Sequence, residues 1–574
     1  MDSSEPENPP QIEIRDTSHI AGVVDALGYH THALSLRVGG SDTAYPVTLG
    51  CVDHQQGVIS LSLLDAQSLD APTLVDQSLS LQAECDAEAL HFDALTALDV
   101  VRDGDMLNIQ CSLPQALHTT SKRSSARIPL LNGMQVKVEI TLYENQPPIQ
   151  GRLRNISLGG ALLEVPLAVS APLKLDEFIA VLSLTFPNGE CFQSMGHIRH
   201  VNPAGRSHDA AIGVAFIHSE QAQEQRLINI VNETERETAY RTGEGSRMSF
   251  PSPLYTSNQP GYKRNGTQRK RTAEKTPMVA AIREVARQLH IMVLALQNQR
   301  PLPAKGLLDS ADILLHLLEK NRQSFFYAIH CLPNESVWIQ HSIAVAARLG
   351  DLMLAEPDHA ARARSAVAAS LMHDMGKVML LGEELTSLEG KLNDEQRERL
   401  RQHVTVLLTQ LEDIDWLDAS IRHEVIGCIN EQLDGSGYPQ ALTGDALPPV
   451  SRMASVIDTI DAMMRPRGDR PAMTAIEVYR YLYHRPACFD KHWVTRYIQR
   501  HGFYPIGSLV KFSRGYLAWV MELDDSGQPR RVRVVYNLNR EKRAMNDILS
   551  RVDFAQLGTL DGLVHPEKFQ LSPF

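Results

Sequence analysis

Hydrophobic and polar positions alternate with a period of two in the first part of the chain. From about residue 12 to 116 this alternation recurs between turns, as in 58–63 (VISLSL), and it predicts a small antiparallel β domain. The alternation continues through 136–140 and 211–217, where the spacing of the strands predicts a second, barrel-like β domain. Apolar residues in 221–237 recur at helical spacing and predict a helix that closes this second domain.

The spacing becomes helical at about Met278 and stays so to about Arg470. The tail returns to strands at 507–512 and 517–521, which predict a hairpin in a small barrel. Prolines and a basic run before the helices indicate a flexible tether. We therefore expect a multidomain α+β chain with these segments: a disordered start (1–11), two N-terminal β-barrel-like domains (12–116 and 117–237), a flexible linker (238–277), an all-α domain (278–499) and a small C-terminal β barrel (500–574).

Composition and charge limit the classes of protein that the chain can belong to. With 574 residues, 43% of them hydrophobic, the chain is long enough for several cores. A net charge of -12 argues against general affinity for nucleic acids, so we expect no DNA partner. The seven cysteines have no CxxC spacing, which favours buried thiols in a reducing cytosol. The start is unlike a signal peptide and no apolar stretch approaches the roughly 20 residues of a membrane span, so we expect a cytoplasmic protein without a transmembrane segment.

Arginines and short polar side chains form a first candidate ligand site. Arg123 and Arg127 are four residues apart, and the run 155–160 (NISLGG) follows them. An arginine fork hydrogen-bonds a phosphate or a guanine edge, and its flat face stacks on a base. Two arginines at this spacing alone usually form a solvated face. Together with the later run, however, they resemble the ligand-binding signature of PilZ domains, which are receptors for cyclic di-GMP.

The PilZ resemblance implies a set of contacts with the nucleotide. The arginines grip it from one side, short polar side chains on the facing strand hydrogen-bond the guanine, and a glycine lets the backbone approach. The residues implied to bind cyclic di-GMP are Lys122, Arg123, Arg127, Asn155, Ser157 and Gly160. The β domain that precedes them resembles the arrangement in flagellar brake proteins, and this likeness covers roughly residues 12 to 235.

Metal-ligating side chains form a second candidate site, in the helical part. His373 and Asp374 are adjacent, so they can place two ligands on one centre. Imidazole and carboxylate together suit iron, manganese or zinc. A glycine-rich turn that ends in Tyr-Pro, 433–439 (LDGSGYP), follows downstream. This pair of motifs resembles the HD-GYP family of bacterial phosphodiesterases, which linearise cyclic di-GMP at a metal centre.

The HD-GYP resemblance implies roles for individual residues. The implied metal ligands are His341, His373, Asp374, His403 and Asp458. The implied catalytic residues are His373, Asp374 and Lys377, of which Lys377 shares a helical face with Asp374 and can meet a substrate phosphate. The implied loop for substrate recognition and for docking diguanylate cyclases consists of Asp434, Gly435, Gly437, Tyr438 and Pro439. The tail resembles a β appendage that often follows HD-GYP helices.

One departure from the HD-GYP pattern bears on activity. Family members have two adjacent histidines where this chain has Ile429 and Asn430. Isoleucine cannot ligate, and an asparagine carbonyl is a poor substitute for imidazole, so the second metal position keeps only Asp374 and His403. His423, two helical turns before Asn430, is the remaining candidate ligand, but a structural histidine is the favoured interpretation. We expect one divalent transition metal ion per chain, iron or manganese.

Two functions are compatible with these motifs. In the first, the chain is a binding protein: its PilZ domain receives cyclic di-GMP, and the HD-GYP-like half is mainly a regulatory or docking module. In the alternative, it is an active metal-dependent phosphodiesterase regulated by its PilZ domain. The missing histidine pair and the brake-like first half favour the binding protein. The candidate partners are cyclic di-GMP, flagellar motor components and diguanylate cyclases, with motility or biofilm formation as the output.

Overall fold

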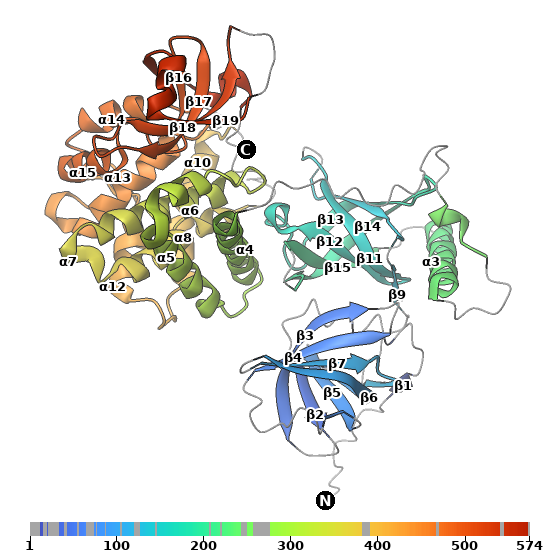
Figure 1. The fold of residues 1–574 in the computed structure, drawn as a ribbon. Coiled ribbons are helices and arrows are strands. Elements are labelled where there is room, and N and C mark those ends of the chain that lie inside the picture. Colours follow the sequence, from blue (N-terminus) through green and yellow to red (C-terminus); the bar gives the residue numbers. More distant parts are fainter. Residues whose placement is uncertain are drawn as a thin grey trace, which may run out of the picture. The chain divides into compact units, whose positions relative to one another are not determined.

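The computed structural model of the chain consists of two compact units, Met1–Gly266 and Thr267–Phe574. The structure describes residues 12–571 apart from 15–19, 21–23, 25–33, 39–42, 54–56, 65–73, 76, 86–87, 104–105, 120–126, 132, 144–145, 206–207, 218–220, 243–249, 257–275, 382–390, 467–469 and 540–544. Strands dominate the described part of the first unit, and helices followed by a sheet make up the second (Figure 1). The expected α+β fold class is confirmed.

A closed β-barrel opens the first unit. Six antiparallel strands are ordered β6-β5-β2-β3-β4-β7, and the pairing of β6 with β7 closes the ring, while β8 and β1 extend outward from β6. Alternate residues of β2 (Leu34, Leu36 and Val38) are buried, so the period-two pattern builds the core. The strands are β1 (Ile12–Ile14), β2 (Leu34–Val38), β3 (Ala44–Asp53), β4 (Val58–Leu64), β5 (Ser78–Cys85), β6 (Glu88–Asp103), β7 (Met106–Ser112) and β8 (Ala116–Thr119).

A second closed barrel follows in the same unit. Its order is β10-β13-β14-β15-β12-β11, closed by the pairing of β10 with residues 149–152 of β11, and the short β9 pairs with Asn155 and Ile156 farther along β11. The predicted closing helix is confirmed as α3, where Thr238 Oγ1 donates a hydrogen bond of 3.1 Å to Pro129 O of β9. The elements are β9 (Ile128–Pro129), β10 (Lys137–Thr141), β11 (Ile149–Ser157), β12 (Gly160–Pro166), η1 (Leu167–Val169), β13 (Phe178–Thr185), β14 (Cys191–Pro203), β15 (Asp209–Ile217), α3 (Gln221–Thr242) and η2 (Pro253–Tyr255).

The second unit is helical over most of its length. Helix α6 is buried on nearly every face and packs against α8 and α13, which agrees with the apolar residues that occur all around it. None of the described helices is long and apolar enough to cross a membrane. The helices are α4 (Pro277–Gln297), α5 (Ala304–Ala328), α6 (Val337–Leu354), α7 (Pro357–Ala360), α8 (Ala363–Met372), α9 (Met375–Met379), α10 (Asp394–Arg401), α11 (His403–Gln410), α12 (Ala419–Ile421), the π-helical η3 (Arg422–Gly427), η4 (Gly444–Ala446), α13 (Pro449–Met463), α14 (Ala475–Tyr483) and α15 (Lys491–His501).

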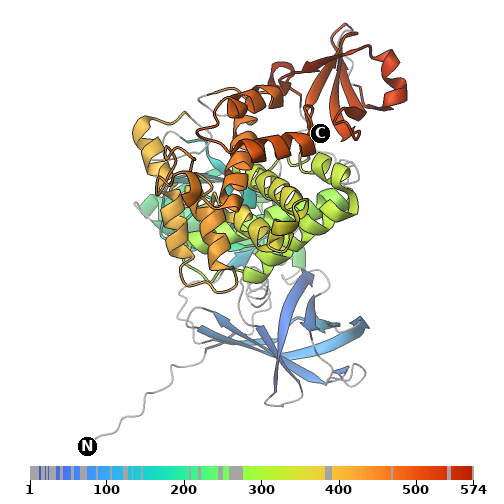
Figure 2. The same cartoon turned by 90° about the vertical axis from the view of Figure 1, so that its left-hand side faces the viewer.

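An antiparallel sheet ends the second unit and lies at one end of its helices (Figure 2). The predicted hairpin is confirmed, with Leu509 of β16 opposite Trp519 of β17. The strand order is β19-β18-β17-β16-β20, so the pairings among the described residues leave the sheet open, where a small barrel was expected. The elements are β16 (Leu509–Phe512), β17 (Tyr516–Leu523), β18 (Pro529–Asn537), β19 (Asp547–Ser550), η5 (Arg551–Gln556), β20 (Leu560–Leu563) and η6 (Pro566–Phe569).

Candidate metal centre and ligand site

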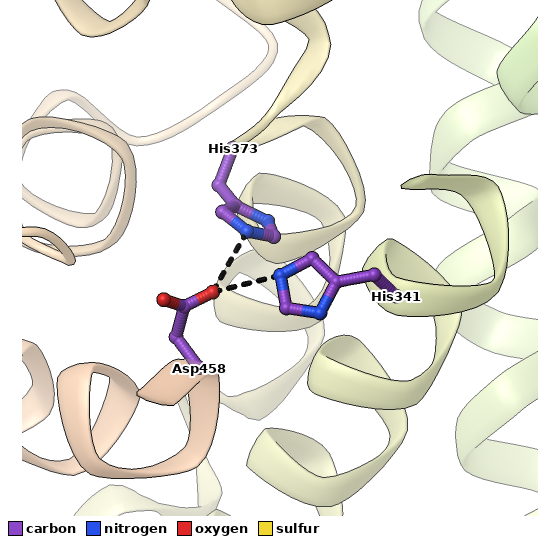
Figure 3. A group of neighbouring side chains, drawn as sticks. All are labelled: His341, His373 and Asp458. Carbon is purple, nitrogen blue, oxygen red and sulfur yellow. Dashed lines mark hydrogen bonds and ion pairs between the residues drawn. The ribbon is translucent and has the colours of Figure 1, made fainter. Parts of the chain in front are cut away.

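Three predicted metal ligands converge inside the helical unit (Figure 3). His341 comes from the second turn of α6, His373 from the end of α8, and Asp458 from α13. His341 Nε2 lies 2.9 Å from Asp458 Oδ1, and His373 Nε2 lies 3.2 Å from the same oxygen. All three ligand atoms lie within 4.8 Å of one another, a spacing that one metal ion can bridge.

The other two predicted ligands border the same centre. Asp374 Oδ2 lies 3.7 Å from His341 Nε2, whereas Asp374 Oδ1 lies 3.5 Å from His373 Nε2 and 3.6 Å from His403 Nε2. Lys377 Nζ donates to this carboxylate at 2.6 Å. Burial raises the pKa of Asp374, but the positive charge of Lys377 and the neighbouring imidazoles outweigh burial and hold that pKa well below its usual value. Asp374 is therefore ionised at neutral pH, as a metal ligand must be.

A glycine in the HD motif allows His403 to reach the centre. His403 is the first residue of α11, and its backbone packs directly on Gly376 of α9. A Cβ atom at Gly376 would lie 2.1 Å from the carbonyl oxygen of His403, which no larger residue can tolerate. The sequence 373–377 (HDMGK) thus supplies ligands and also makes room for a further ligand from another helix.

Backbone carbonyls set the orientation of two of the imidazoles. His373 Nδ1 donates to Ser370 O and His403 Nδ1 donates to Leu400 O, each at 2.7 Å. Because Nδ1 holds the proton, Nε2 is left with a free lone pair that faces the centre. The Nε2 atom of His403 is fully buried and has no hydrogen-bond partner among the described residues. A buried acceptor in this position fits a bound cation.

A carboxylate that the sequence pattern did not single out as functional orients the third imidazole. His341 Nδ1 bonds Asp461 Oδ2 at 2.7 Å, and Asp461 also accepts hydrogen bonds from Arg348 and Arg465. A carboxylate behind a metal-ligating histidine holds the ring in place and makes Nε2 a stronger ligand. The sequence could have indicated this role of Asp461, because Asp461 follows Asp458 by three residues and therefore lies near it on one helix.

The electrostatic field of the centre favours a cation. Burial lowers the pKa of His341, but its hydrogen bonds with Asp458 and Asp461 outweigh burial and raise that pKa to about 9. Burial lowers the pKa of His403 to about 4, with a further contribution from the charge of Lys377. The pocket thus attracts positive charge beside His341 and keeps His403 neutral, which is the form that binds metal.

The predicted glycine-rich loop lies against the His403 side of the centre. The ring of Tyr438 is 6.0 Å from that of His403, edge to face, and the Tyr438 hydroxyl donates to Asn430 Oδ1 at 2.9 Å. Gly435 has the expected positive φ, and the Tyr438–Pro439 peptide bond is cis. Asp434 Oδ1 accepts a hydrogen bond of 3.0 Å from Ser436 N and shapes the turn, and a Cβ atom at Gly437 would lie 2.4 Å from Glu431 Cα.

Ile429 and Asn430, which stand where the family has two histidines, both contribute to the packing of the fold. Ile429 is 1% exposed and belongs to the apolar core, while the Asn430 amide serves the loop through Tyr438. His423 lies in the π-helical turn η3, is exposed, and has its Nε2 3.5 Å from Cys428 Sγ. This placement agrees with the structural interpretation of His423. It does not supply an imidazole for the second metal position.

Strand pairing in the second barrel brings part of the first candidate site together. Asn155 of β11 is opposite Pro129 of β9, and Ile156 is opposite Ile128, so Arg127 directly precedes the strand residue that pairs next to Ser157. Asn155 and Ser157 lie two residues apart and share a face of the strand. Lys122 and Arg123 lie outside the described residues.

The polar residues of β11 are buried and incompletely bonded. Asn155 and Ser157 are each 5% exposed, and Ser157 Oγ donates to Gly160 O at 3.2 Å. The Asn155 Oδ1 atom is buried without a hydrogen-bond partner in the described part of the chain. A buried acceptor without a donor costs free energy, so it is a natural contact for a ligand N–H group.

Gly160 has a structural role that the sequence pattern did not indicate. It pairs with Ala215 of β15, and a Cβ atom there would lie 2.1 Å from Val214 O. The neighbouring strand therefore requires the glycine whether or not a ligand approaches it.

The Gly160→Ala variant is expected to unfold at a lower temperature than the unchanged protein. The added methyl group meets a backbone oxygen that cannot rotate away, and such overpacking typically costs about 1–3 kcal/mol. Thermal unfolding followed by calorimetry measures the effect. Unchanged stability combined with lost cyclic di-GMP binding would instead assign the glycine to ligand approach.

Two parts of the chain match known domain families. Residues 121–233 match the PilZ domain family, and residues 316–491 match the HD domain family. The chain therefore carries a PilZ domain followed by an HD domain. The candidate ligand strand lies in the first of these domains, and all five candidate metal ligands lie in the second.

Several curated proteins resemble parts of the chain. A cyclic di-GMP phosphodiesterase of Pseudomonas aeruginosa is 29% identical over 225 residues, which are 38% of this chain and 52% of that protein. A 3'3'-cGAMP-specific phosphodiesterase of Vibrio cholerae is 33% identical over 21% of this chain and 27% of its own length. A cyclic di-GMP phosphodiesterase response regulator of Xanthomonas campestris is 30% identical over 22% and 33%. The chain spans about half the length of the first relative and a third or less of the others.

Two solved structures have local similarity to parts of the chain. YcgR of Escherichia coli in complex with c-di-GMP is 16% identical and covers 40% of this chain and 96% of that chain, with a TM-score of 0.23. An HDG"Y"P protein of Bdellovibrio bacteriovorus is 12% identical and covers 58% and 98%, with a TM-score of 0.34.

Proposed function

We propose that the chain is a cyclic di-GMP signalling protein whose PilZ domain binds the nucleotide and whose HD domain holds one divalent metal ion, iron or manganese. In this proposal the HD domain acts mainly as a regulatory or docking module. The proposed domains are an N-terminal β domain (12–116), the PilZ domain (117–237), a linker (238–277), the HD-GYP-like domain (278–499) and a β appendage (500–574).

The main support for this proposal is that the first metal position has its full set of candidate ligands, whereas the second does not. The first has a full set of ligands in His341, His373, Asp374 and Asp458, within reach of one another. The second has Asp374 and His403, but its missing imidazoles are replaced by a core isoleucine and by an amide committed to Tyr438. A two-metal hydrolase needs both ions to stabilise the attacking and the leaving oxygen, so one ion supports binding better than turnover.

The residues around the metal centre fit a cation with nitrogen and oxygen ligands. A bound iron or manganese ion would supply Lewis acidity and lower the pKa of a bound water. The chain itself orients His341 through Asp461, keeps Asp374 ionised, and places the Lys377 ammonium at the edge of the centre. An ammonium there can hold an anionic phosphate group.

The proposed nucleotide site of the PilZ domain rests on chemical fit. Cyclic di-GMP has two phosphates and two flat purines, which suit arginine as a hydrogen-bond donor and as a stacking surface. Arg127 directly precedes β9, which pairs with β11, and the unpaired Asn155 Oδ1 can accept from a guanine N–H. Flagellar motor components and diguanylate cyclases are the proposed protein partners.

The alternative function is an active phosphodiesterase regulated by the PilZ domain. It is favoured by Lys377 and His403, which retain their places at the centre, and by the names of the curated relatives, which are phosphodiesterases. In that case His373, Asp374 and Lys377 are the catalytic residues.

Incubation of the full chain with cyclic di-GMP and manganese or ferrous iron separates the two functions. We expect no detectable linear pGpG or GMP by ion-exchange chromatography, because the second metal position lacks imidazoles. The double variant Ile429→His, Asn430→His is expected to bind a second metal equivalent and to gain at least about tenfold in hydrolysis. Adding Asp374→Asn to the double variant should remove that gain. Steady turnover by the unchanged chain, with two or more metal ions, would establish the phosphodiesterase.

A further inference from the structure

A buried arginine lies directly behind the metal centre. Arg348 of α6 is 4% exposed, and its Nη1 donates to Asp461 Oδ1 at 3.2 Å and to Ala344 O at 3.1 Å. Asp461 is the carboxylate that bonds His341 Nδ1. A buried carboxylate needs positive partners to stay ionised and fixed. Arg348 therefore acts on the orientation of a metal ligand although it does not touch the centre.

Arg348 also borders a small cavity within the second unit. The cavity has a volume of about 10 Å³, roughly that needed by one water molecule. Helices contribute Arg322, Arg348 and His501 to its wall, and the C-terminal segment contributes Pro505, Ile506 and Leu523. Arg348, which bonds Asp461, and Leu523 of the C-terminal sheet thus line the same cavity.

A second buried ionic cluster holds the helices around this cavity. Asp351 lies one turn after Arg348 on α6 and accepts two hydrogen bonds of 2.8 Å from Arg322 of α5. Arg500 of α15 donates two more to the same carboxylate, at 3.0 and 2.7 Å. Removing either arginine leaves a buried charge less compensated, so the three helices are coupled at this point.

Two hydrogen bonds, here called the clamp, join the C-terminal sheet to α5, the helix that carries Arg322. Leu523 N of β17 donates to Gln323 Oε1 at 2.6 Å, and Gln323 Nε2 donates to Leu523 O at 3.0 Å. Gln323 directly follows Arg322 on α5, and the Leu523 side chain is part of the cavity wall. The sheet is therefore joined to α5 at a residue that also lines the cavity.

We propose that Arg348 is a positioning residue of the metal centre and that the C-terminal sheet keeps it in position by forming part of the wall of the cavity beside it. The path runs from the sheet through Leu523 to the cavity wall, then through Arg348 and Asp461 to His341. This inference rests on the proposed function, since it requires that the centre binds a metal ion. It makes the sheet part of the support of the metal centre. An opening of the sheet admits water to Arg348 and weakens its hold on Asp461.

Manganese binding to full-length variants tests the role of Arg348. Arg348→Met is expected to weaken Mn²⁺ binding about 10–100-fold, the usual effect of removing a group behind a metal ligand. Arg348→Lys keeps the positive charge and should recover part of the loss. Isothermal titration of the metal-stripped protein measures the dissociation constants. Rescue by lysine separates positioning by charge from a loss of packing, which lysine would not restore to the same degree.

The chain offers a matched control for this test. Arg364 forms a two-bond pair with Asp312, at 2.6 and 2.7 Å, but that pair is about half exposed and lies away from Asp461. Arg364→Met should leave Mn²⁺ affinity unchanged, because an exposed ion pair contributes little. If Mn²⁺ affinity falls equally in the Arg364 and Arg348 variants, the loss reflects general destabilisation of the helical unit, and the proposal is overturned.

A double-mutant cycle tests the contribution of the sheet. Gln323→Ala removes the clamp and should weaken Mn²⁺ binding about 3–10-fold alone, with little further loss when it is added to Arg348→Met. If the losses of Mn²⁺ affinity in the two single variants add fully in the double variant, or if Gln323→Ala loses no affinity, the sheet does not act on the metal centre through Arg348. If the unchanged protein binds Mn²⁺ and Arg348→Met binds it equally well, the inference fails while the proposed metal centre stands. If the unchanged protein binds no divalent metal, both fail.

Discussion

The His373→Ala variant is expected to be purified with almost no bound metal, below about 0.1 ion per chain, whereas the unchanged protein carries about one. The His373 imidazole is fixed by Ser370 O, and its Nε2 points at Asp458 and Asp374 from within the core. No other described imidazole can replace it, because His341 and His403 are held at their own positions by Asp461 and by a backbone carbonyl. Losing a direct ligand should cost more than the roughly 100-fold upper range for groups behind the ligands.

Elemental analysis of the purified chains measures this difference. His423→Ala is the matched control, since it removes an exposed imidazole that bonds Cys428 and should leave the metal content unchanged. Thermal unfolding of both variants shows whether the helical unit remains folded. Full metal content in a folded His373→Ala protein would refute the assignment of this centre.

The second large effect is expected in the PilZ domain. The double variant Arg123→Ala, Arg127→Ala should bind cyclic di-GMP more than about 100-fold more weakly, because each charge-assisted arginine contact contributes about 1.5–3 kcal/mol. Arg127 directly precedes β9, which pairs with β11 at Asn155 and Ile156, and Asn155 Oδ1 is buried without a hydrogen-bond partner among the described residues. Calorimetric titration of the full chain gives the affinity directly.

The comparison for this experiment is Arg199→Ala on β14. Arg199 is an exposed arginine of the same barrel that pairs with Asp176 at 3.1 Å, so its loss changes the net charge by one unit without touching β11. Its affinity for cyclic di-GMP should match that of the unchanged protein. Equal affinities in the double variant and the unchanged chain would contradict the assignment of the nucleotide site.

Local patterns in the sequence were sufficient to predict the type of each main element. Period-two alternation predicted the strands of both barrels, and helical spacing predicted α3 and the helical unit, because each pattern reflects which side of an element is buried. The order of His341, His373, His403 and Asp458 in recognisable motifs was enough to select candidate metal ligands, of which His341, His373 and Asp458 lie within 4.8 Å of one another. The structural role of His423 was also favoured before its contact with Cys428 was visible.

The closure of the two barrels and the orientation of the His341 imidazole depend on contacts between residues far apart in the chain. The pairings of β6 with β7 and of β10 with β11, and the open edge of the last sheet, follow from strand partners that a local pattern does not specify. The roles of Asp461 and Arg348 appear only when α6 packs against α13, since the two helices are separated by about a hundred residues. The requirement for glycine at position 160 also appears only in the folded structure, because the Val214 carbonyl that a Cβ atom would meet belongs to another strand.

The sequence by itself determined which chemical groups this protein has: imidazoles and carboxylates in the order of an HD motif, arginines before a short polar strand, and an isoleucine and an asparagine in place of two histidines. Only the tertiary structure decided how those groups are held. Hydrogen bonds to Nδ1 atoms, the buried charges behind His341 and the packing of His403 on Gly376 arise from helices brought together by burial of their apolar faces. Such contacts depend on distances in space, and positions along the chain do not encode them locally.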